Sequence, residues 1–147
     1  MPMCAERGID MTDLELMQFA EAARKFSYCP YSHFSVGAAL LTCNGKVYTG
    51  CNVENAAYTP TNCAERTAVF KAVSEGETRF AAIAIIGAPE GEKGRFCAPC
   101  GVCRQVLSEF CEADTFRVIL GTTESAQAYT LAELLPASFG PLDLKGE

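Results

Sequence analysis

Three cysteines stand at even spacing in the stretch RFCAPCGVCR, where Cys97, Cys100 and Cys103 form two overlapping Cys-x-x-Cys pairs. The first pair is typical of a redox dithiol, and the second is typical of half a metal site. A thioredoxin-like dithiol directly follows a buried strand. Here a charged, glycine-containing stretch precedes Cys97, and Pro99 favours a helix that begins at Cys100. The sequence therefore favours a metal site over a redox dithiol.

A second helix start supplies a third candidate ligand, Cys63, in the stretch NCAER. Cys100 and Cys103 lie three residues apart, so both thiolates can point at one ion from the first turn of a helix. A helix N-terminus also lowers the pKa of a thiol. Glu65 follows Cys63 closely enough to reach the open face of the ion without binding it. Three protein ligands and one open position are the pattern of a catalytic zinc.

A structural zinc site with four cysteine ligands, the fourth being Cys97, is the alternative. Glu65 counts against it, because a buried glutamate beside a closed site would have no task. Three thiolates and one zinc leave a net negative charge, which makes a bound water a poorer acid. The two helix N-termini offset this charge, and Arg66 or Arg104 could offset more of it.

The elements that must position these residues follow from apolar periodicity and turn residues. A capping box from Thr12 to Glu15 starts a first helix, and an Asn-Gly turn joins the first two strands. The order of elements predicts an α/β fold, a three-layer α/β/α sandwich with a mixed five-stranded sheet. We expect helices at 13–26, 64–75 and 100–110, strands at 34–42, 46–53, 80–87, 116–121 and 126–131, and a short helix near the C-terminus.

Length and composition are those of one globular domain, covering residues 1–147 with a flexible tail at 1–10. The formal net charge is -6 and no Lys/Arg cluster occurs, so we expect a small neutral ligand and no nucleic acid. No apolar run is long enough for a membrane span. Nine cysteines without a secretion signal indicate a reducing, cytoplasmic location, with thiols that bind metal or fill the core.

Together these motifs resemble a known family. Cys-Ala-Glu, followed further along the chain by Pro-Cys-x-x-Cys-Arg-Gln, is similar to the zinc-dependent cytidine deaminases. Cys63 in place of histidine resembles their small three-cysteine branch, which acts on free nucleosides as a homotetramer. The resemblance extends through CPYSHFSVGAALLT, GCNVENAAYTPTNCAERTAVFKAVSEG and ELLPASFGPLDL, and covers most of residues 29–144.

The resemblance implies a reaction and a role for each residue of the metal site. Cytidine and deoxycytidine are hydrolysed to uridine and deoxyuridine with release of ammonia, in pyrimidine salvage. Cys63, Cys100 and Cys103 hold one zinc per chain, which activates a water. Glu65 moves the protons, and Arg66 is the charge partner of the thiolates.

The resemblance also implies residues that bind the substrate. Phe34 packs on the pyrimidine ring, Asn52 and Glu54 bind the ribose, and the main-chain N–H of Ala64 contacts the base edge. Tyr58 and Phe139 correspond to residues that reach a neighbour's active site in tetrameric relatives, so active sites are shared.

Simpler roles are possible for some of these residues. Phe34 and Phe139 could be core residues, and Asn52 could be a turn residue at a strand end.

Two other functions compete with cytidine deamination. A blasticidin-type aminonucleoside deaminase shares both cysteine motifs, but the intact Asn52-Val53-Glu54-Asn55 favours cytidine. A catalytically inactive, zinc-stabilised binding protein is the alternative from another class, and Glu65 argues against it because an inactive site has little use for that carboxylate.

Overall fold

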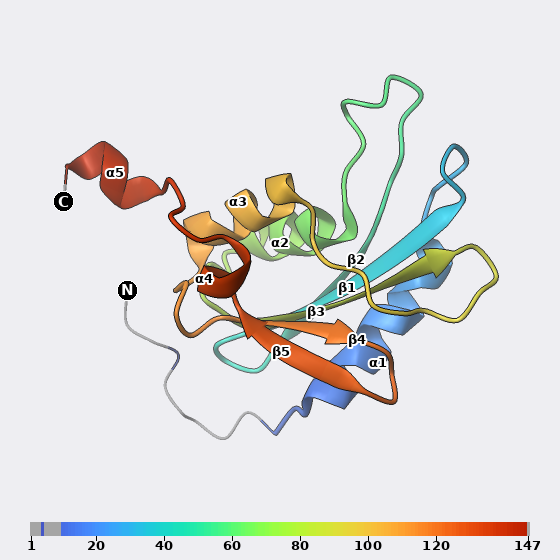
Figure 1. Cartoon of the computed structure of the whole chain (residues 1–147), viewed down its shortest axis with the longest axis horizontal. Helices are drawn as coiled ribbons and strands as arrows, with labels where there is room; N and C mark the ends of the chain where they lie inside the picture. The colour runs from blue at the N-terminus through green and yellow to red at the C-terminus, as the bar shows by residue number, and fades with distance from the viewer. Residues whose placement is uncertain (1–3, 5–9, 147) are drawn as a thin grey trace.

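A mixed five-stranded sheet lies at the centre of the fold, with strand order β2-β1-β3-β4-β5 and helices on both faces (Figure 1). This confirms the predicted three-layer α/β architecture. The computed structural model describes residue 4 and residues 10–146, so most of the predicted tail at 1–10 lies outside the described residues. The elements are α1 (Asp13–Ala23), η1 (Arg24–Phe26), β1 (Phe34–Thr42), β2 (Val47–Cys51), α2 (Ala64–Ser74), β3 (Phe80–Pro89), α3 (Gly101–Phe110), β4 (Arg117–Gly121), β5 (Ala126–Thr130), α4 (Leu131–Leu134) and α5 (Pro141–Lys145).

The strand directions bring two helix starts to one edge of the sheet. β1 is antiparallel to both β2 and β3, so β2 and β3 run in the same direction, and β3 is parallel to β4. Helix α2 follows β2 and helix α3 follows β3, as crossover connections between strands that run the same way. Both helices therefore begin near the carboxyl ends of the strands, where α/β sheets place their sites.

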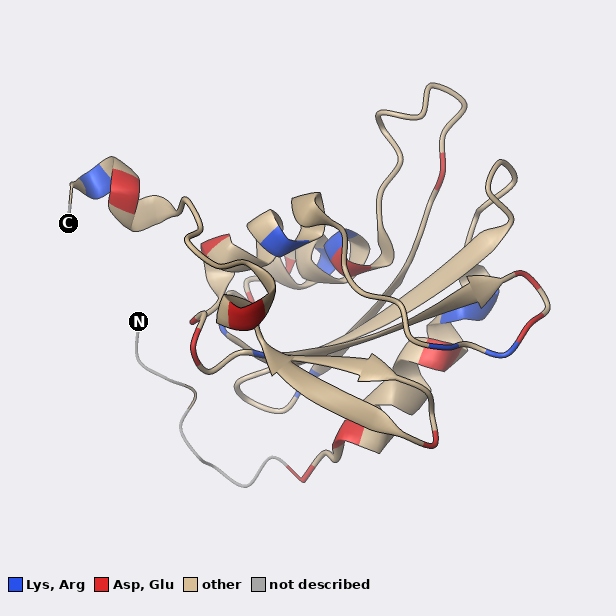
Figure 2. Ribbon diagram, viewed as in Figure 1, with Lys and Arg blue, Asp and Glu red and all other residues tan. Residues whose placement is uncertain are grey.

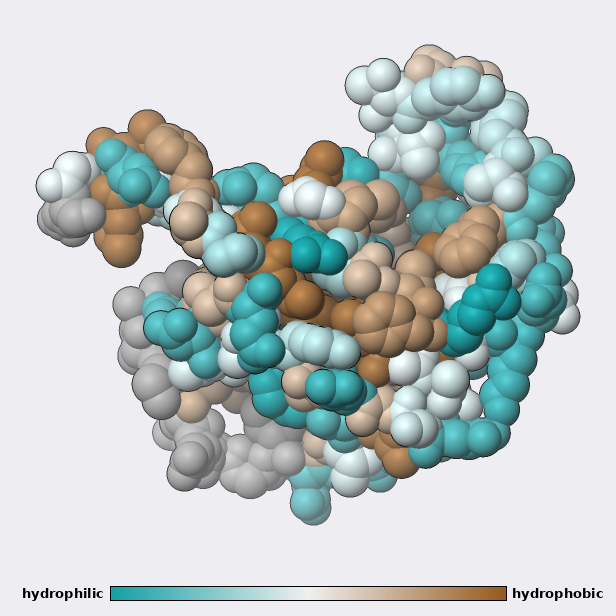
Figure 3. All heavy atoms as spheres, viewed as in Figure 1, coloured by the Kyte–Doolittle hydropathy of each residue, from teal (hydrophilic) through white to brown (hydrophobic). Residues whose placement is uncertain are grey.

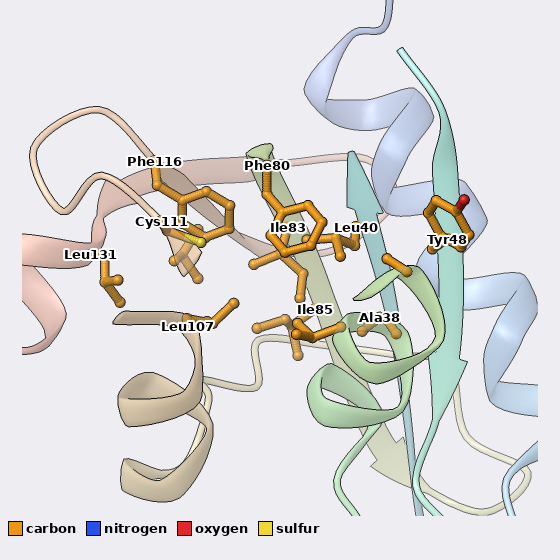
Figure 4. Packing of buried hydrophobic residues seen from close by; sticks show 14 of the residues in the cluster. Ala38, Leu40, Tyr48, Phe80, Ile83, Ile85, Leu107, Cys111, Phe116 and Leu131 are labelled. Atoms are coloured by element: carbon orange, nitrogen blue, oxygen red, sulfur yellow. The ribbon is translucent and has the colours of Figure 1, made fainter. Parts of the chain in front are cut away.

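Alternate residues of the central strands supply the two halves of the core, as the two-residue period of a strand requires. Ala38 and Leu40 face α2 and α3, where they join Ile83, Leu107 and Phe116 (Figure 4). The intervening residues of β1 face α1 on the opposite side of the sheet. Because the strands are buried on both faces, their register is fixed, and with it the position of each strand end.

Helix α2 lies against β2 without an intervening side chain. A Cβ on Gly50 would lie 2.4 Å from the carbonyl oxygen of Ala64 and 2.6 Å from the main-chain nitrogen of Ala68. Only glycine allows this approach. The first turn of α2, which carries Glu65, is thereby fixed relative to the sheet.

Most local signals in the sequence were accurate, but the second strand ends at Cys51 and not at residue 53, and two short helices, α4 and α5, stand where one was expected. The capping box at Thr12 and the hairpin turn at Gly45, with φ +90°, are both present. The first helix, however, ends at Ala23 and continues as the 3-10 turn η1. The expectation that all cysteines are thiols is wrong for one pair, because a disulfide joins Cys4 to Cys43. Pairing of this kind depends on a long-range approach that spacing does not reveal.

Charged and apolar side chains are distributed over the surface of the described residues as follows. Figure 2 shows acidic and basic segments interspersed over the helices and loops. None of the helices in the described residues is long and apolar enough to cross a membrane. Apolar atoms gather at the centre of the face seen in Figure 3 and on the projecting segment α5, where Leu142 and Leu144 are exposed.

Candidate functional site

Three cysteine thiols meet where α2 and α3 begin. Cys63 is the N-cap of α2 and Cys100 is the N-cap of α3, and Cys103 lies one turn further along α3. The Sγ atoms of Cys63 and Cys100 are 3.8 Å apart, and those of Cys100 and Cys103 are 3.5 Å apart. All three sulfur atoms lie within 4.8 Å of one another. The structure thus brings together the three predicted ligands.

The cluster fits a tetrahedral zinc ion. With Zn–S bonds of about 2.3 Å, tetrahedral geometry requires sulfur atoms about 3.8 Å apart, close to the separations observed here. Thiolates are also the ligand type that favours zinc over magnesium or calcium. Cys97 is not part of this three-residue group among the described residues. The alternative of a closed four-cysteine site with Cys97 therefore has no support in the geometry.

Arg66 supports a thiolate at Cys63. Its Nη2 donates to the Sγ of Cys63 over 3.3 Å, while its buried Nε finds no acceptor within the described part of the chain. A hydrogen bond from Cys103, together with the guanidinium of Arg66, lowers the pKa of Cys63 to about 5 despite its burial. Arg104, the other arginine considered, instead donates to the carbonyl oxygens of Pro99 and Leu134 at 2.8 and 2.6 Å.

Glu65 is buried beside the thiols, on the first turn of α2, and is only 4% exposed. Burial raises the pKa of its carboxyl to about 7, and the negative charge of Cys63 also raises it. A carboxyl group with a pKa near neutrality can both accept and release a proton at working pH. The site therefore contains a group suited to proton transfer next to a metal-binding cluster.

An apolar wall adjoins the cluster at the ends of β1 and β3. A Cβ on Gly87 would lie 3.0 Å from the Phe34 ring, 3.1 Å from the Sγ of Cys97 and 3.1 Å from Val36. Phe34 is half-buried rather than part of the core. Burial raises the pKa of Cys97 to about 11, and the charge of Glu65 raises it further, so Cys97 is a neutral thiol in this wall. A flat, uncharged ligand could pack against these residues.

Asn52 and Glu54 lie beyond β2, and both bind the main chain around β1. The side-chain amide of Asn52 accepts from the main-chain nitrogen of Val36 at 2.9 Å and donates to the carbonyl of Phe34 at 2.8 Å. These two side-chain hydrogen bonds continue the pairing of β1 with β2 past the end of β2. This structural role matches the alternative of a residue at a strand end, and it fixes the backbone of Phe34.

The carboxylate of Glu54 holds the loop before β1. Its Oε1 accepts from the main-chain nitrogens of Tyr31 and Ser32 at 3.0 and 3.1 Å, and the Ser32 hydroxyl donates to Oε2. The Ser32 hydroxyl bond lowers the pKa of Glu54, and the main-chain bonds add to this effect. Sequence reasoning missed Ser32, because no motif relates a serine to a glutamate so distant in the chain.

The remaining predicted residues differ in exposure. Ala64 is buried at the start of α2, where its main-chain N–H belongs to the first turn. Tyr58 and Phe139 are 71% and 60% exposed, so the core role considered for Phe139 is wrong. Tyr58 has a positive φ of 61° and packs edge-on against Tyr31. Both aromatic rings are available to contacts outside this chain.

Comparison with known proteins agrees with this geometry. Residues 10–121 match the family described as cytidine and deoxycytidylate deaminase zinc-binding region. The chain is 46% identical to a cytidine deaminase of Sporosarcina psychrophila, over 88% of this chain and 93% of the relative. It is 49% identical to one from Halalkalibacterium halodurans, over 88% and 95%. A crystal structure of cytidine deaminase from Burkholderia pseudomallei superposes with a TM-score of 0.79 at 47% identity, over 88% of this chain and 100% of that one.

Proposed function

The chain belongs to the zinc-dependent cytidine and deoxycytidylate deaminase family, and from this membership we propose that it hydrolyses cytidine and deoxycytidine to uridine and deoxyuridine with release of ammonia. The observation that carries the proposal is the buried carboxyl of Glu65 beside the thiols of Cys63, Cys100 and Cys103. A structural metal site would not need that carboxyl.

The three cysteines would hold one zinc, which supplies a Lewis acid and makes water a nucleophile near neutral pH. Glu65 does the proton transfers. Its carboxylate takes a proton from the attacking water and delivers it to ring nitrogen N3, and a second proton passes through the same carboxyl to the departing amine. The balance is one nucleoside and one water consumed, and one keto product and one ammonia formed. Arg66 keeps Cys63 in the thiolate form throughout.

The substrate residues follow from the same arrangement. Phe34, with Gly87 and Cys97 behind it, forms an apolar surface for the pyrimidine ring. The N–H of Ala64, in the first turn of α2, would donate to the base edge. Glu54 presents an ionised carboxylate for sugar hydroxyls, since Ser32 keeps its pKa low.

For Asn52, a direct sugar contact would use the second N–H of its amide, since the first holds Phe34.

A homotetramer with shared active sites is part of this proposal. The exposed rings of Tyr58 and Phe139 and the apolar surface of α5 are the features that support it. Gln105 on α3 donates to the carbonyl oxygen of Phe139 at 2.8 Å, which fixes the segment that carries this ring. Exposed aromatic groups of this kind are typical anchors of subunit interfaces.

We also propose that residues 1–147 act as one catalytic domain in pyrimidine salvage, in the cytoplasm. A reducing compartment would keep the cluster thiols free for zinc. A disulfide such as the one between Cys4 and Cys43 is rare in proteins of a reducing compartment. Counting thiols in protein isolated under alkylating conditions would decide whether this pair forms in the cell.

The function is tested by ultraviolet-monitored deamination with cytidine, deoxycytidine and blasticidin S in parallel, on protein of measured zinc content. We expect rapid loss of the cytidine absorbance with about one zinc per chain. Turnover of blasticidin S alone would overturn the substrate assignment. Zinc without turnover of any of the three would instead favour a binding protein.

A further inference from the structure

A buried arginine joins the chain segments that form the apolar wall of the site. Arg24 in η1 is 7% exposed. Its Nε donates to the carbonyl of Ser35 at 3.0 Å, and its Nη2 donates to the Ser35 hydroxyl at 2.9 Å and to the carbonyl of Ala88 at 3.2 Å. Its Nη1 donates to the carbonyl of Glu92 at 3.1 Å and to the carboxylate of Glu21 at 2.8 Å. All five guanidinium donors are therefore used, as burial of this charge requires.

These acceptors lie next to the residues of the wall. Ser35 follows Phe34 in β1, and Ala88 follows Gly87 in β3. Glu92 lies in the loop that leads from β3 to Cys97, and this loop is paired with β3 through two main-chain hydrogen bonds between Gly87 and Arg95. Most of the acceptors are main-chain carbonyls, so Arg24 holds the backbone of three segments at one point.

Arg24 acts from the face of the sheet opposite the metal cluster. Residues of β1 alternate between faces, so Phe34 lies on the α2 and α3 side when Ser35 lies on the α1 side. A Cβ on Gly37 would lie 1.9 Å from the carbonyl of Ala20 and 3.0 Å from the Cγ of Arg24, so the end of α1 rests directly on β1. This close approach brings the guanidinium of Arg24 within hydrogen-bond distance of its acceptors in β1, β3 and the loop after β3.

We propose that Arg24 is a positioning residue for the base-binding wall, holding Phe34, Gly87 and the Cys97 loop in place through the sheet. The inference rests on the proposed function in one respect, because it takes this wall to face the pyrimidine. Arg24 lies behind the sheet and is not a catalytic residue. Its loss should loosen the wall and weaken nucleoside binding, while the thiol cluster on the far side of the sheet keeps its zinc.

A merely structural role is the competing explanation, because Arg24 also ties α1 to the sheet. Arg117 provides a matched control. It pairs with Asp13 and so ties the other end of the same helix to β4, away from the wall. The two side chains of this pair are 40% and 38% exposed, so Arg117→Met should lower the melting temperature only slightly and leave nucleoside binding unchanged.

The test compares Arg24→Met and Arg24→Lys with Arg117→Met as full-length, zinc-loaded protein. We expect Arg24→Met to raise both KM for cytidine and Kd for uridine by about tenfold or more, with a smaller fall in kcat and unchanged zinc content. Arg24→Lys keeps the charge but loses the planar fork, so its effect should be intermediate. If Arg24→Met does not fold, Arg24→Lys alone decides the question.

Hydrogen–deuterium exchange separates this inference from the proposed function. Amides at 34–36 and 87–95 should exchange faster in both Arg24 variants and at the wild-type rate in Arg117→Met. Unchanged KM, Kd and exchange in a folded Arg24 variant would overturn the inference, as would equal changes in Arg117→Met. A wild-type protein that neither binds nor converts nucleosides would overturn the proposed function. Hydrogen–deuterium exchange in the Arg24 variants would even then show whether Arg24 holds the wall residues in place.

Discussion

The metal end of the site and the end at Asn52 and Glu54, which we propose binds the sugar and call the sugar end, are built in different ways. The metal end stands on the first turns of α2 and α3, whose docking on the sheet fixes Cys63, Glu65 and Cys100. The sugar end consists of connecting segments held by side chains, with Glu54 bonded to the main chain at Ser32. Rigid helix starts suit a metal geometry that tolerates little displacement, whereas a loop bound by hydrogen bonds can adapt to a sugar.

The two glutamates show the same difference in chemical terms. Glu65 is buried, and burial raises the pKa of its carboxyl to about 7. Glu54 lies near the surface, and its bond from Ser32 lowers its pKa. One residue type thus has a raised pKa at the metal end, as the proposed proton carrier needs, and a lowered pKa at the proposed sugar end, as a charged hydrogen-bond acceptor needs.

The largest effect should come from removal of a metal ligand. We expect Cys100→Ser to lose its zinc and to lower kcat/KM by about 10⁴-fold or more, because no nucleophile is then generated. Cys97→Ser is the matched control for metal binding on the same segment and should keep its zinc, with any loss of activity appearing in KM because Cys97 lies in the proposed base-binding wall. Metal analysis and initial rates on both proteins measure the outcome. Equal zinc loss in the two variants would show that Cys97 is also a ligand, and would support the alternative of a four-cysteine structural site.

Glu65→Gln should have the next largest effect. The amide keeps the shape of the side chain but cannot carry a proton, so kcat should fall by about 10²–10⁴-fold while zinc content and melting temperature remain near wild type. Single-turnover rates with cytidine measure the chemical step directly. A near-normal rate in zinc-loaded Glu65→Gln would show that another group moves the protons.

The same contrast explains what the sequence could predict. Cys100 and Cys103 could be paired because their spacing on one helix start translates directly into geometry, whereas the choice of Cys63 as the third ligand came from its place at a second helix start and from the family resemblance. The continuous apolar run at 80–87, the Asn-Gly hairpin turn and the order of elements likewise predicted the sheet.

By contrast, the bond from Ser32 to Glu54 joins distant segments through loop conformations that no period encodes. The carbonyl contacts of Arg24 belong to this second class, since any residue type supplies a carbonyl group.

At the sugar end, Glu54→Gln should raise KM for cytidine by about tenfold with a smaller change in kcat, because a charged acceptor of hydroxyl groups is lost. Glu90→Gln is the control. Glu90 accepts from the thiol of Cys29 at 3.1 Å and pairs with His33 at 3.4 Å, so it holds the same loop from the other side. Steady-state kinetics with cytidine measure KM and kcat for both variants. Equal effects would mean that Glu54 acts by holding the loop and not by binding the sugar.

Phe139→Ala should have a smaller effect, and one that depends on assembly. If the ring enters a neighbour's site, kcat/KM should fall by about five- to tenfold, because one apolar contact with the substrate is lost. Phe19→Ala, at an exposed aromatic residue of α1 on the opposite face of the sheet, is the control. Kinetics combined with light scattering would measure both activity and mass. A wild-type protein that is fully active as a monomer would contradict shared sites.

The smallest expected effect is a pH-dependent difference in stability at the sugar end. The folded-state pKa of Glu54 is lowered by Ser32, so ionised Glu54 stabilises the fold above the ordinary glutamate pKa and loses this contribution as pH falls through the lowered value. Wild type should therefore be slightly more stable than Glu54→Gln at neutral pH, and the two should converge in acid. Urea unfolding across this range, with Glu109→Gln as a control for the loss of one exposed carboxylate, measures the difference. A gap that stays constant in acid would show that the Ser32 bond does not favour the charged form, and the contrast with Glu65 would then rest on burial alone.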